Sequence, residues 1–199
     1  MGDIPADSGM LNLMNFQGRH PDGRGVSSIY FASGGYGALD GMDGAACMPF
    51  PSNMTSTPVE TWENLTSVTI ERKQFLIDSG GPGRYRGGLG QEIVFRNDSG
   101  HPMTVACFGA RTEFPSLGIR GGQPGSLRRY VINDQPVHSK GRYVLAPGDV
   151  IRTWEPGGGG VGDPRDRARD AVLEDVRQGF VSPGAARREY GVDADGGAL

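Results

Sequence analysis

The sequence predicts a mainly β fold with minor α structure. We expect a glycine-loop-rich β-sandwich or barrel-like body with two short C-terminal helices. Short runs rich in β-branched and aromatic residues recur along the chain, and Gly, Pro, Asn and Asp separate them. The chain has 34 glycines in 199 residues, about 17% against a usual share of roughly 7%. Because the glycines cluster between the apolar runs, the pattern favours a folded protein over a low-complexity tail.

The first part of the chain gives one strand and one helix candidate. Residues 1–25 show neither helical nor strand periodicity, so we expect extended chain and turns. Residues 26–33 (VSSIYFAS) combine β-branched and aromatic residues, which predicts a strand. After a glycine-rich loop, residues 58–65 are expected to form one or two helical turns. Thr57 would cap these turns and Pro58 would take the first helical position.

The middle of the chain contains further strand candidates. Residues 67–77 predict a strand, one face of which would carry Val68, Ile70, Arg72, Gln74 and Leu76. Strands are also expected at residues 92–97 and 103–110, and the turn residues between them predict a hairpin. Later strands are expected at residues 127–133, ending in a turn at Asn133 and Asp134, and at residues 142–154, where a Pro-Gly turn precedes a returning strand.

The end of the chain changes character. Asp166 is expected to cap a helix that Gly179 ends, and Ser182 with Pro183 starts a second helix that Gly191 ends. We therefore divide the chain into a glycine-rich β domain, residues 1–162, and a short helical tail, residues 163–199. Each tail helix has one modest apolar stripe, so the tail is expected to dock on a partner or on the body.

Composition excludes several classes of protein. The net charge is −3 and no basic run occurs, so we expect neither nucleic acid nor a membrane as partner. No apolar run approaches the ~20 residues of a membrane span, and the N-terminus lacks the pattern of a signal peptide. Cys47 and Cys107 are expected to stay reduced as small buried hydrophobes. These observations predict a cytoplasmic protein.

Common catalytic motifs are missing from the sequence. It contains no GxSxG, P-loop, HExxH or CxxC pattern. The three histidines, His20, His101 and His138, are scattered. We therefore expect no metal site and no nucleophile–base pair in this chain alone.

The glycine blocks carry more information. The block GGYGALDGMDG leaves backbone N–H groups uncovered, which suits close approach of a carboxylate, a phosphate or another backbone. Within it, Asp40 and Asp43 could bind a cation or form turns. Arg84 and Arg86 lie in a second block and could hold an anion or form surface pairs. The run PGGGGVGDP lacks the lysine of a phosphate loop, so we do not predict a nucleotide site there.

Several blocks together resemble the hydantoinase B/oxoprolinase family. They are GGYGALDGMDG, TPVETWE, DSGGPGRYRGGLGQE, GGQPGS and LAPGDVIRTWEPGGGGVGDPRDRARDAVLEDVRQGFVSPGAARREYGV, in the family's order and spacing, over residues 27–192. The chain resembles only the C-terminal portion of these longer proteins. It could therefore be a truncated fragment or a naturally split subunit, and we favour the split subunit.

The resemblance implies a role in a complex. Family members work with a hydantoinase A-type subunit in which ATP, with Mg, activates a poorly reactive amide or carbonyl oxygen of a small-molecule substrate by phosphorylation. A separate polypeptide would supply the N-terminal half of the B-type subunit, with a possible transition metal (Mn, Zn or Fe). This chain alone would bind no cofactor and is expected to be inactive alone.

The leading hypothesis from this resemblance is a subunit of a hetero-oligomeric ATP-dependent amidohydrolase of the hydantoinase/5-oxoprolinase type. The alternatives are a subunit of an acetone- or acetophenone-type carboxylase, and a non-catalytic assembly subunit. Arg84 and Arg86 are candidates for anion or inter-subunit contacts. The candidates for the substrate cavity are Gly34, Gly35, Asp40, Asp43, Asn53, Ser56, Thr57 and Glu60.

Overall fold

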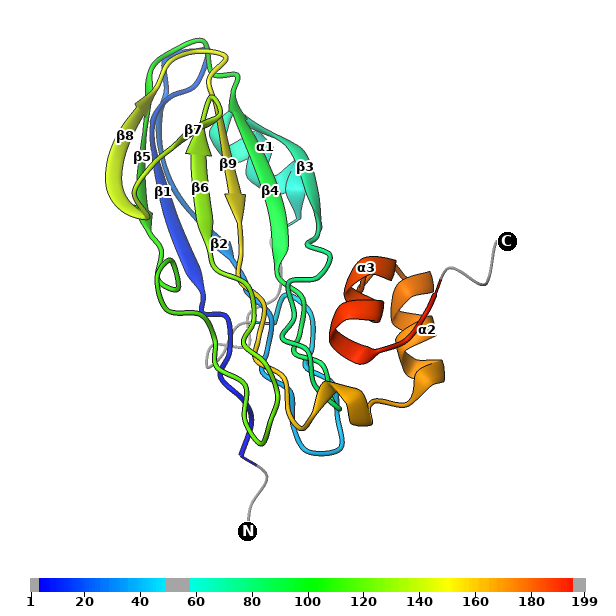
Figure 1. Cartoon of the computed structure of the whole chain (residues 1–199). Helices are drawn as coiled ribbons and strands as arrows, with labels where there is room; N and C mark the ends of the chain where they lie inside the picture. The colour runs from blue at the N-terminus through cyan, green and yellow to red at the C-terminus, as the bar shows by residue number, and fades with distance from the viewer. Residues whose placement is uncertain (1–3, 49–57, 195–199) are drawn as a thin grey trace.

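The chain folds into two antiparallel sheets packed face to face, as a computed structural model shows (Figure 1). The structure describes residues 4–48 and 58–194. One sheet has the order β2-β1-β5-β8 and comprises β1 (Asn12–Arg19), β2 (Gly25–Ala32), β5 (Met103–Phe108) and β8 (Lys140–Leu145). The other has the order β3-β4-β9-β6-β7 and comprises β3 (Val68–Phe75), β4 (Gln91–Asn97), β6 (Arg129–Ile132), β7 (Gln135–Pro136) and β9 (Val150–Trp154). The predicted β-rich class is confirmed, in its sandwich form.

The core between the sheets is dominated by aromatic side chains. Helix α1 (Val59–Thr66) contacts β2 and β3, the edge strands on one side of the sandwich, and inserts Trp62 between them. The Trp62 ring lies edge-on to Phe16 and Tyr30, with ring centres 5.1 and 5.0 Å apart. Such edge-to-face pairs stabilise by about 0.5–1.5 kcal/mol beyond area burial. Trp62 thus closes one side of the sandwich.

Most predicted elements are present. The structure has strands within all the predicted ranges from residue 26 onward, and a helix at the predicted place before β3. Asn133 and Asp134 both have positive φ, 47° and 61°, and make the tight turn between β6 and β7. Pro58 precedes α1 instead of starting it. Thr57, its predicted cap, lies outside the described residues.

Two predictions about the strands are wrong. The N-terminal residues contain β1, whose inward Asn12, Met14 and Phe16 alternate with less buried residues. This alternation is hard to recognise in the sequence because the run has few β-branched residues. The hairpin between β4 and β5 is also wrong: β4 pairs with β3 and β9, whereas β5 pairs with β1 and β8. The turn between them carries the chain from one sheet to the other.

The predicted face of β3 is wrong beyond Ile70. The register of β3 on β4 shifts between Ile70 and Arg72, which marks a β-bulge at Glu71. Lys73 is therefore the partner of Ile93, a core residue of β4. Since residues paired across two strands point to the same face, Lys73 points inward and Arg72 outward.

The glycine-rich segments continue from the strands and form a second body, the glycine bundle. Its centre is segment 156–161, which directly follows β9. Backbone hydrogen bonds of 2.8–3.0 Å join this segment to six others around it: 5–9, 33–38, 79–83, 85–90, 116–119 and 122–126. Figure 1 shows these segments running on from the lower ends of the strands. Backbone thus packs on backbone.

The central segment of the glycine bundle repeats every three residues. A Cβ added to Gly157 would lie 1.8 Å from a backbone oxygen of segment 79–83. A Cβ added to Gly160 would lie 2.3 Å from another backbone oxygen of the same segment. A Cβ on the two glycines between them would strike two other segments, again near 2.1 Å. Three residues per turn is the period of the polyproline II helix. Only glycine fits such a segment when it is surrounded on every side.

The tail consists of η1 (Pro164–Asp166), α2 (Arg169–Arg177), α3 (Pro183–Ala185) and η2 (Ala186–Tyr190). Gly179 and Gly191 follow these helices with positive φ, and the Ser182 side chain caps α3, as predicted. The cap at Asp166 is wrong, because Asp166 lies in η1 and α2 starts after Ala168. The tail lies against the glycine bundle (Figure 1).

Candidate functional site

The two candidate glycines lie inside the glycine bundle. A Cβ on Gly34 would come within 2.5 Å of the Gly9 oxygen, and one on Gly35 within 1.9 Å of the Gly88 oxygen. The Gly35 N–H donates to the Pro156 oxygen at 2.9 Å. The sequence allowed a carboxylate, a phosphate or another backbone to approach this block closely. The structure shows another backbone there. The role of both glycines in a substrate cavity stays a prediction.

The two candidate aspartates have arginine partners. Asp40 pairs with Arg120 at 2.5 Å, and both side chains are about half exposed. Asp43 accepts hydrogen bonds from both terminal nitrogens of Arg167, each at 2.7 Å, and from the Arg86 backbone N–H at 2.7 Å. Burial is the largest single influence and favours the neutral acid, but the hydrogen bonds and positive charges of Arg167 and Arg86 together outweigh it and lower the pKa of Asp43.

Asp43, which is partly exposed, and the buried Arg86 belong to one cluster that attaches the tail. The Arg86 guanidinium contacts Asp175 of α2 at 3.3 Å, and Arg167 contacts the same carboxylate at 2.8 Å. The side chains of Arg86, Arg167 and Asp175 are all less than a tenth exposed. Arg86 therefore makes an internal contact between body and tail. We call the group of four residues the tail cluster; its members are Asp43, Arg86, Arg167 and Asp175.

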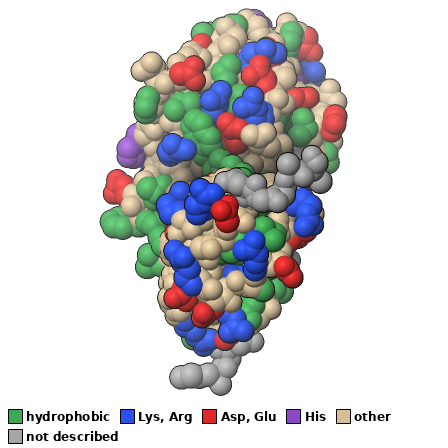
Figure 2. Space-filling view, turned by 45° about the vertical axis from the view of Figure 1, so that its right-hand side comes forward, with side chains coloured by type: hydrophobic (Ala, Val, Ile, Leu, Met, Phe, Trp, Pro, Cys, Tyr) green, Lys and Arg blue, Asp and Glu red, His purple; other side chains and the backbone are tan. Residues whose placement is uncertain are grey.

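The remaining candidates lie apart from one another. Arg84 is exposed, with its guanidinium 5.6 Å from the centre of the Tyr85 ring. Glu60 is exposed in the first turn of α1. Three further candidates, Asn53, Ser56 and Thr57, lie outside the described residues. On the face shown in Figure 2, acidic and basic side chains are interspersed.

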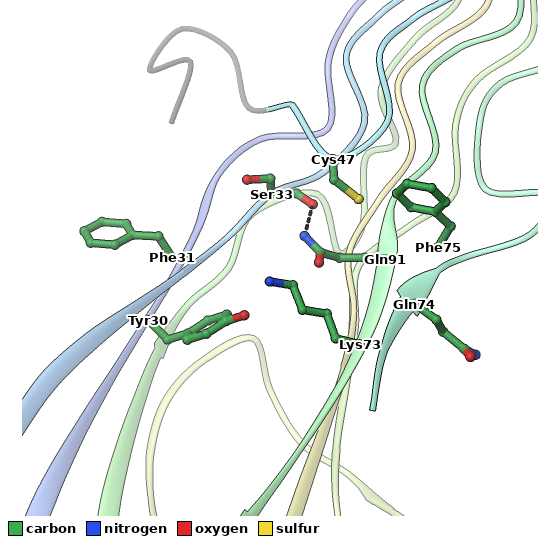
Figure 3. A pocket seen from close by; sticks show the side chains of 8 residues that line it. All are labelled: Tyr30, Phe31, Ser33, Cys47, Lys73, Gln74, Phe75 and Gln91. Carbon is green, nitrogen blue, oxygen red and sulfur yellow. Dashed lines mark hydrogen bonds between the residues drawn. The ribbon is translucent and has the colours of Figure 1, made fainter. Parts of the chain in front are cut away.

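A cavity of about 430 Å³ lies between the edge strands β2 and β3 (Figure 3). We call it the edge cavity, and its lining residues are Tyr30, Phe31, Ser33, Cys47, Lys73, Gln74, Phe75 and Gln91. The bulge in β3 turns Lys73 toward it, and Gln91 is held by a 2.9 Å hydrogen bond to the Ser33 oxygen. None of these residues is a candidate from the sequence.

Burial controls the charge in the edge cavity. Burial lowers the pKa of Lys73 and raises the pKa of both Tyr30 and Cys47. For Cys47, burial together with the negative charge of Glu155 raises the pKa to about 12, so the thiol is neutral at pH 7. The same two causes raise the pKa of Tyr30, which keeps its hydroxyl protonated. The cavity therefore presents hydrogen-bond donors.

The Glu155 charge is itself held in a fully buried network. Arg128 and Glu155 have no exposed side-chain surface and lie 2.7 Å apart. Glu155 also accepts hydrogen bonds from Asn12 at 2.7 Å and from Thr153 at 2.5 Å. The guanidinium of Arg128 donates to two backbone oxygens besides, those of Ala110 and Met10. This pairing satisfies the groups that burial would otherwise penalise.

The described residues contain neither a metal-ligand cluster nor a membrane-spanning helix. No group of three or more His, Cys, Asp or Glu side chains is close enough to hold a metal ion within residues 4–48 and 58–194. In the same ranges no helix has the length and apolar character to cross a membrane. Both described cysteines are free.

Comparison with known proteins gives a consistent result. The family model described as hydantoinase B/oxoprolinase matches residues 2–164. The caprolactamase β subunit of Pseudomonas jessenii is 33% identical over 180 residues, covering 86% of this chain and 31% of that protein. In the crystal structure of the ATP-dependent caprolactamase from the same organism, the matching chain superposes with a TM-score of 0.85 at 27% identity, over 98% of this chain and 36% of the other.

Two further relatives have other activities in their names. The B-type component of a putative D-/L-hydantoinase from Pseudomonas sp. strain NS671 is 28% identical over 200 residues, 95% of this chain and 33% of that protein. The acetone carboxylase α subunit of Xanthobacter autotrophicus is 26% identical over 214 residues, 87% of this chain and 27% of that protein. The chain thus spans a third or less of the length of each of these curated relatives.

Proposed function

This chain belongs to the hydantoinase B/oxoprolinase family, and from that membership we propose that it is one part of a hetero-oligomeric, ATP-dependent amidohydrolase. The similarity to the ATP-dependent caprolactamase supports this function most directly, because it holds in sequence and in fold and covers nearly the whole chain. The reaction would open a cyclic or other amide of a small molecule after activation by ATP.

The cofactors would be held outside the described residues. We propose that ATP and Mg²⁺ bind a hydantoinase A-type partner, in the cytoplasm where ATP is available. A transition metal (Mn, Zn or Fe) would bind the remainder of a B-type subunit. The glycine run of this chain does not suit a phosphate, because the N–H groups of residues 158–161 all donate to backbone oxygens inside the glycine bundle.

The test is reconstitution. We would co-express this chain with a hydantoinase A-type subunit and the remainder of a B-type subunit, and supply ε-caprolactam, hydantoin or 5-oxoproline. The expected result is ring opening coupled to ATP hydrolysis, measured by mass spectrometry and phosphate release, and independent of bicarbonate. Consumption of a ketone that requires bicarbonate would instead show a carboxylase, and ring opening that proceeds equally without this chain would overturn the proposal.

The same complex tests whether the chain serves assembly alone. Asn53→Ala and Glu60→Ala would be compared with the unaltered complex, after gel filtration has shown that each variant assembles. A loss of turnover supports the proposed contacts with the substrate. Unchanged turnover in both variants would assign the chain an assembly role and remove these residues from the site.

A further inference from the structure

The sheet β2-β1-β5-β8 has a face that points away from the core, which we call the outer face. It consists of the residues that alternate along these strands with the buried core residues. Such a face is usually polar in an antiparallel sheet, because water covers it. The outer face instead carries the apolar residues Leu13, Ile29, Phe31, Ala106, Phe108 and Val144. Of these, Ile29, Phe108 and Val144 are 48%, 58% and 66% exposed.

The apolar residues form a continuous patch across three strands. Leu13 of β1 is the partner of Phe31 on β2. Phe108 of β5 lies on the other side of Leu13, because the adjacent residues Met14 and Cys107 are partners. Figure 1 shows β5 and β8 on the side of the molecule away from α1 and the tail. Exposed apolar patches of this kind mark interaction sites.

The edge strand β8 places positive charge beside this patch. Lys140 is the partner of Phe108 and Arg142 is the partner of Ala106, so both cations project from the outer face. Both side chains are exposed, and neither forms an ion pair with any of the described residues. None of the four strands contains an acidic residue. The outer face therefore attracts an acidic surface and repels a second copy of itself.

Two further features show that the outer face lacks partners within this chain. The side-chain oxygen of Asn15, on β1, is buried and has no hydrogen-bond partner among the described residues. A buried polar atom without a partner is costly, and a donor from another surface would relieve that cost. A hollow of about 360 Å³ also opens between β5 and β8, beside Phe108, Lys140 and Arg142. Such a hollow suits an anchoring side chain of a protein partner.

The relatives indicate which partner this face would take. More than two thirds of the caprolactamase β subunit lies outside the match to this chain, so in that protein both parts belong to one polypeptide. Parts of one polypeptide stay together permanently, and permanent interfaces are more apolar than transient ones. The apolar outer face therefore fits the remainder of a B-type subunit better than a transient partner.

We propose that the outer face docks the remainder of a B-type subunit. The surface that it meets would be apolar at its centre and would carry acidic side chains opposite Lys140 and Arg142. This inference rests on the proposed function for the existence of that partner, and it adds the place on this chain where the partner binds.

Hydroxyl-radical footprinting of the assembled complex tests the proposal. This chain would be co-expressed with the part of the Pseudomonas jessenii β subunit that lies outside the match, without an A-type subunit. We expect Phe108 to be oxidised about fivefold or more slowly in the complex than in the chain alone, because a docked partner excludes solvent. Phe75 is about as exposed and lies on β3 of the other sheet, so it should react equally in both.

Variants separate the charged contact from the apolar one. Arg142→Glu and Phe108→Ser should each weaken association about tenfold or more, measured by sedimentation of the purified complex at several concentrations. Arg129→Glu makes the same charge change on β6 of the other sheet and should leave association unchanged. All three side chains are exposed, so the urea midpoints of the variant chains should match that of the unaltered chain.

Several results would overturn the proposal. They are an equal rate of Phe108 oxidation in the complex and in the chain alone, protection that appears only with an A-type subunit, and no association of the two polypeptides. Protection in the chain alone that is lost on dilution would identify a second copy as the occupant. None of these readouts requires turnover. A complex with Phe108 protected that opens no amide contradicts only the proposed function, whereas amide opening with Phe108 unprotected contradicts only this inference.

Discussion

Gly35 shows how closely backbone atoms approach in the glycine bundle. A side chain there would meet the Gly88 oxygen at 1.9 Å, which no real Cβ contact tolerates. We expect Gly35→Ala to lower the free energy of unfolding by about 1–3 kcal/mol or more, because backbone must shift to admit the methyl group. Urea denaturation followed by circular dichroism measures this change.

Gly25 provides the matched control for that substitution. A Cβ at Gly25 would meet nothing within 4 Å, and the residue begins strand β2. Gly25→Ala should therefore change the free energy of unfolding by no more than about 0.5 kcal/mol. Equal effects of the two substitutions would contradict the packing described for the glycine bundle.

Arg128 is a second residue whose removal should be costly. Arg128→Met leaves the fully buried Glu155 carboxylate without its cation, which typically costs about 3–5 kcal/mol of stability. Arg24→Met breaks the exposed pair with Asp22 and should cost less than about 1 kcal/mol. Chemical denaturation of both variants measures the difference. A cost for Arg128→Met as small as that of Arg24→Met would show that the network does not hold the fold.

The elements show where sequence reasoning succeeds and where it stops. Strand composition places most strands from β2 onward, because β-branched and aromatic runs report local preference. Pairing between strands is not local, so the turn residues between β4 and β5 predict a hairpin where the chain instead changes sheet. The edge cavity could not be predicted for the same reason, because a β-bulge also depends on strand pairing. The bulge at Glu71 exchanges the inward and outward faces of β3 beyond it, so that Lys73 points into the edge cavity.

The attachment of the tail should depend on pH through Asp43. In the folded protein the pKa of Asp43 lies below its ordinary value of 3.8. The ionised Asp43 carboxylate therefore stabilises the folded protein fully above pH 3.8, and this stabilisation is lost as the pH falls through the lowered pKa. Asp43→Asn should cost about 1.5 kcal/mol at pH 7, near the low end for charged hydrogen bonds, because the side chain is 34% exposed.

Hydrogen exchange of α2 locates this effect. We expect faster exchange of α2 amides in Asp43→Asn than in the unaltered chain at pH 7, with stability measurements converging below pH 3.8. Asp40→Asn, which breaks only the exposed pair with Arg120, is the control and should leave α2 unaffected. Equal protection of α2 in all three proteins would show that the tail cluster does not attach the tail.

At the scale of the whole molecule, two bodies with different interiors share the same chain segments. The sandwich holds apolar and aromatic side chains between its sheets. The glycine bundle holds mainly backbone, and its central segment directly continues β9. Because strands of the sandwich run on into bundle segments, neither body can open without disturbing the other.

The backbone interior of the glycine bundle has a calorimetric consequence. Exposing apolar surface on unfolding raises the heat capacity, whereas exposing peptide groups lowers it. A body built from peptide groups should therefore reduce the heat-capacity change of unfolding below the usual ~12–15 cal/mol/K per residue. Scanning calorimetry at several pH values would measure it, and a value within the usual range would argue against a peptide-filled interior. The expected stability curve is broad and shallow, so this protein should lose little stability between cold and warm conditions.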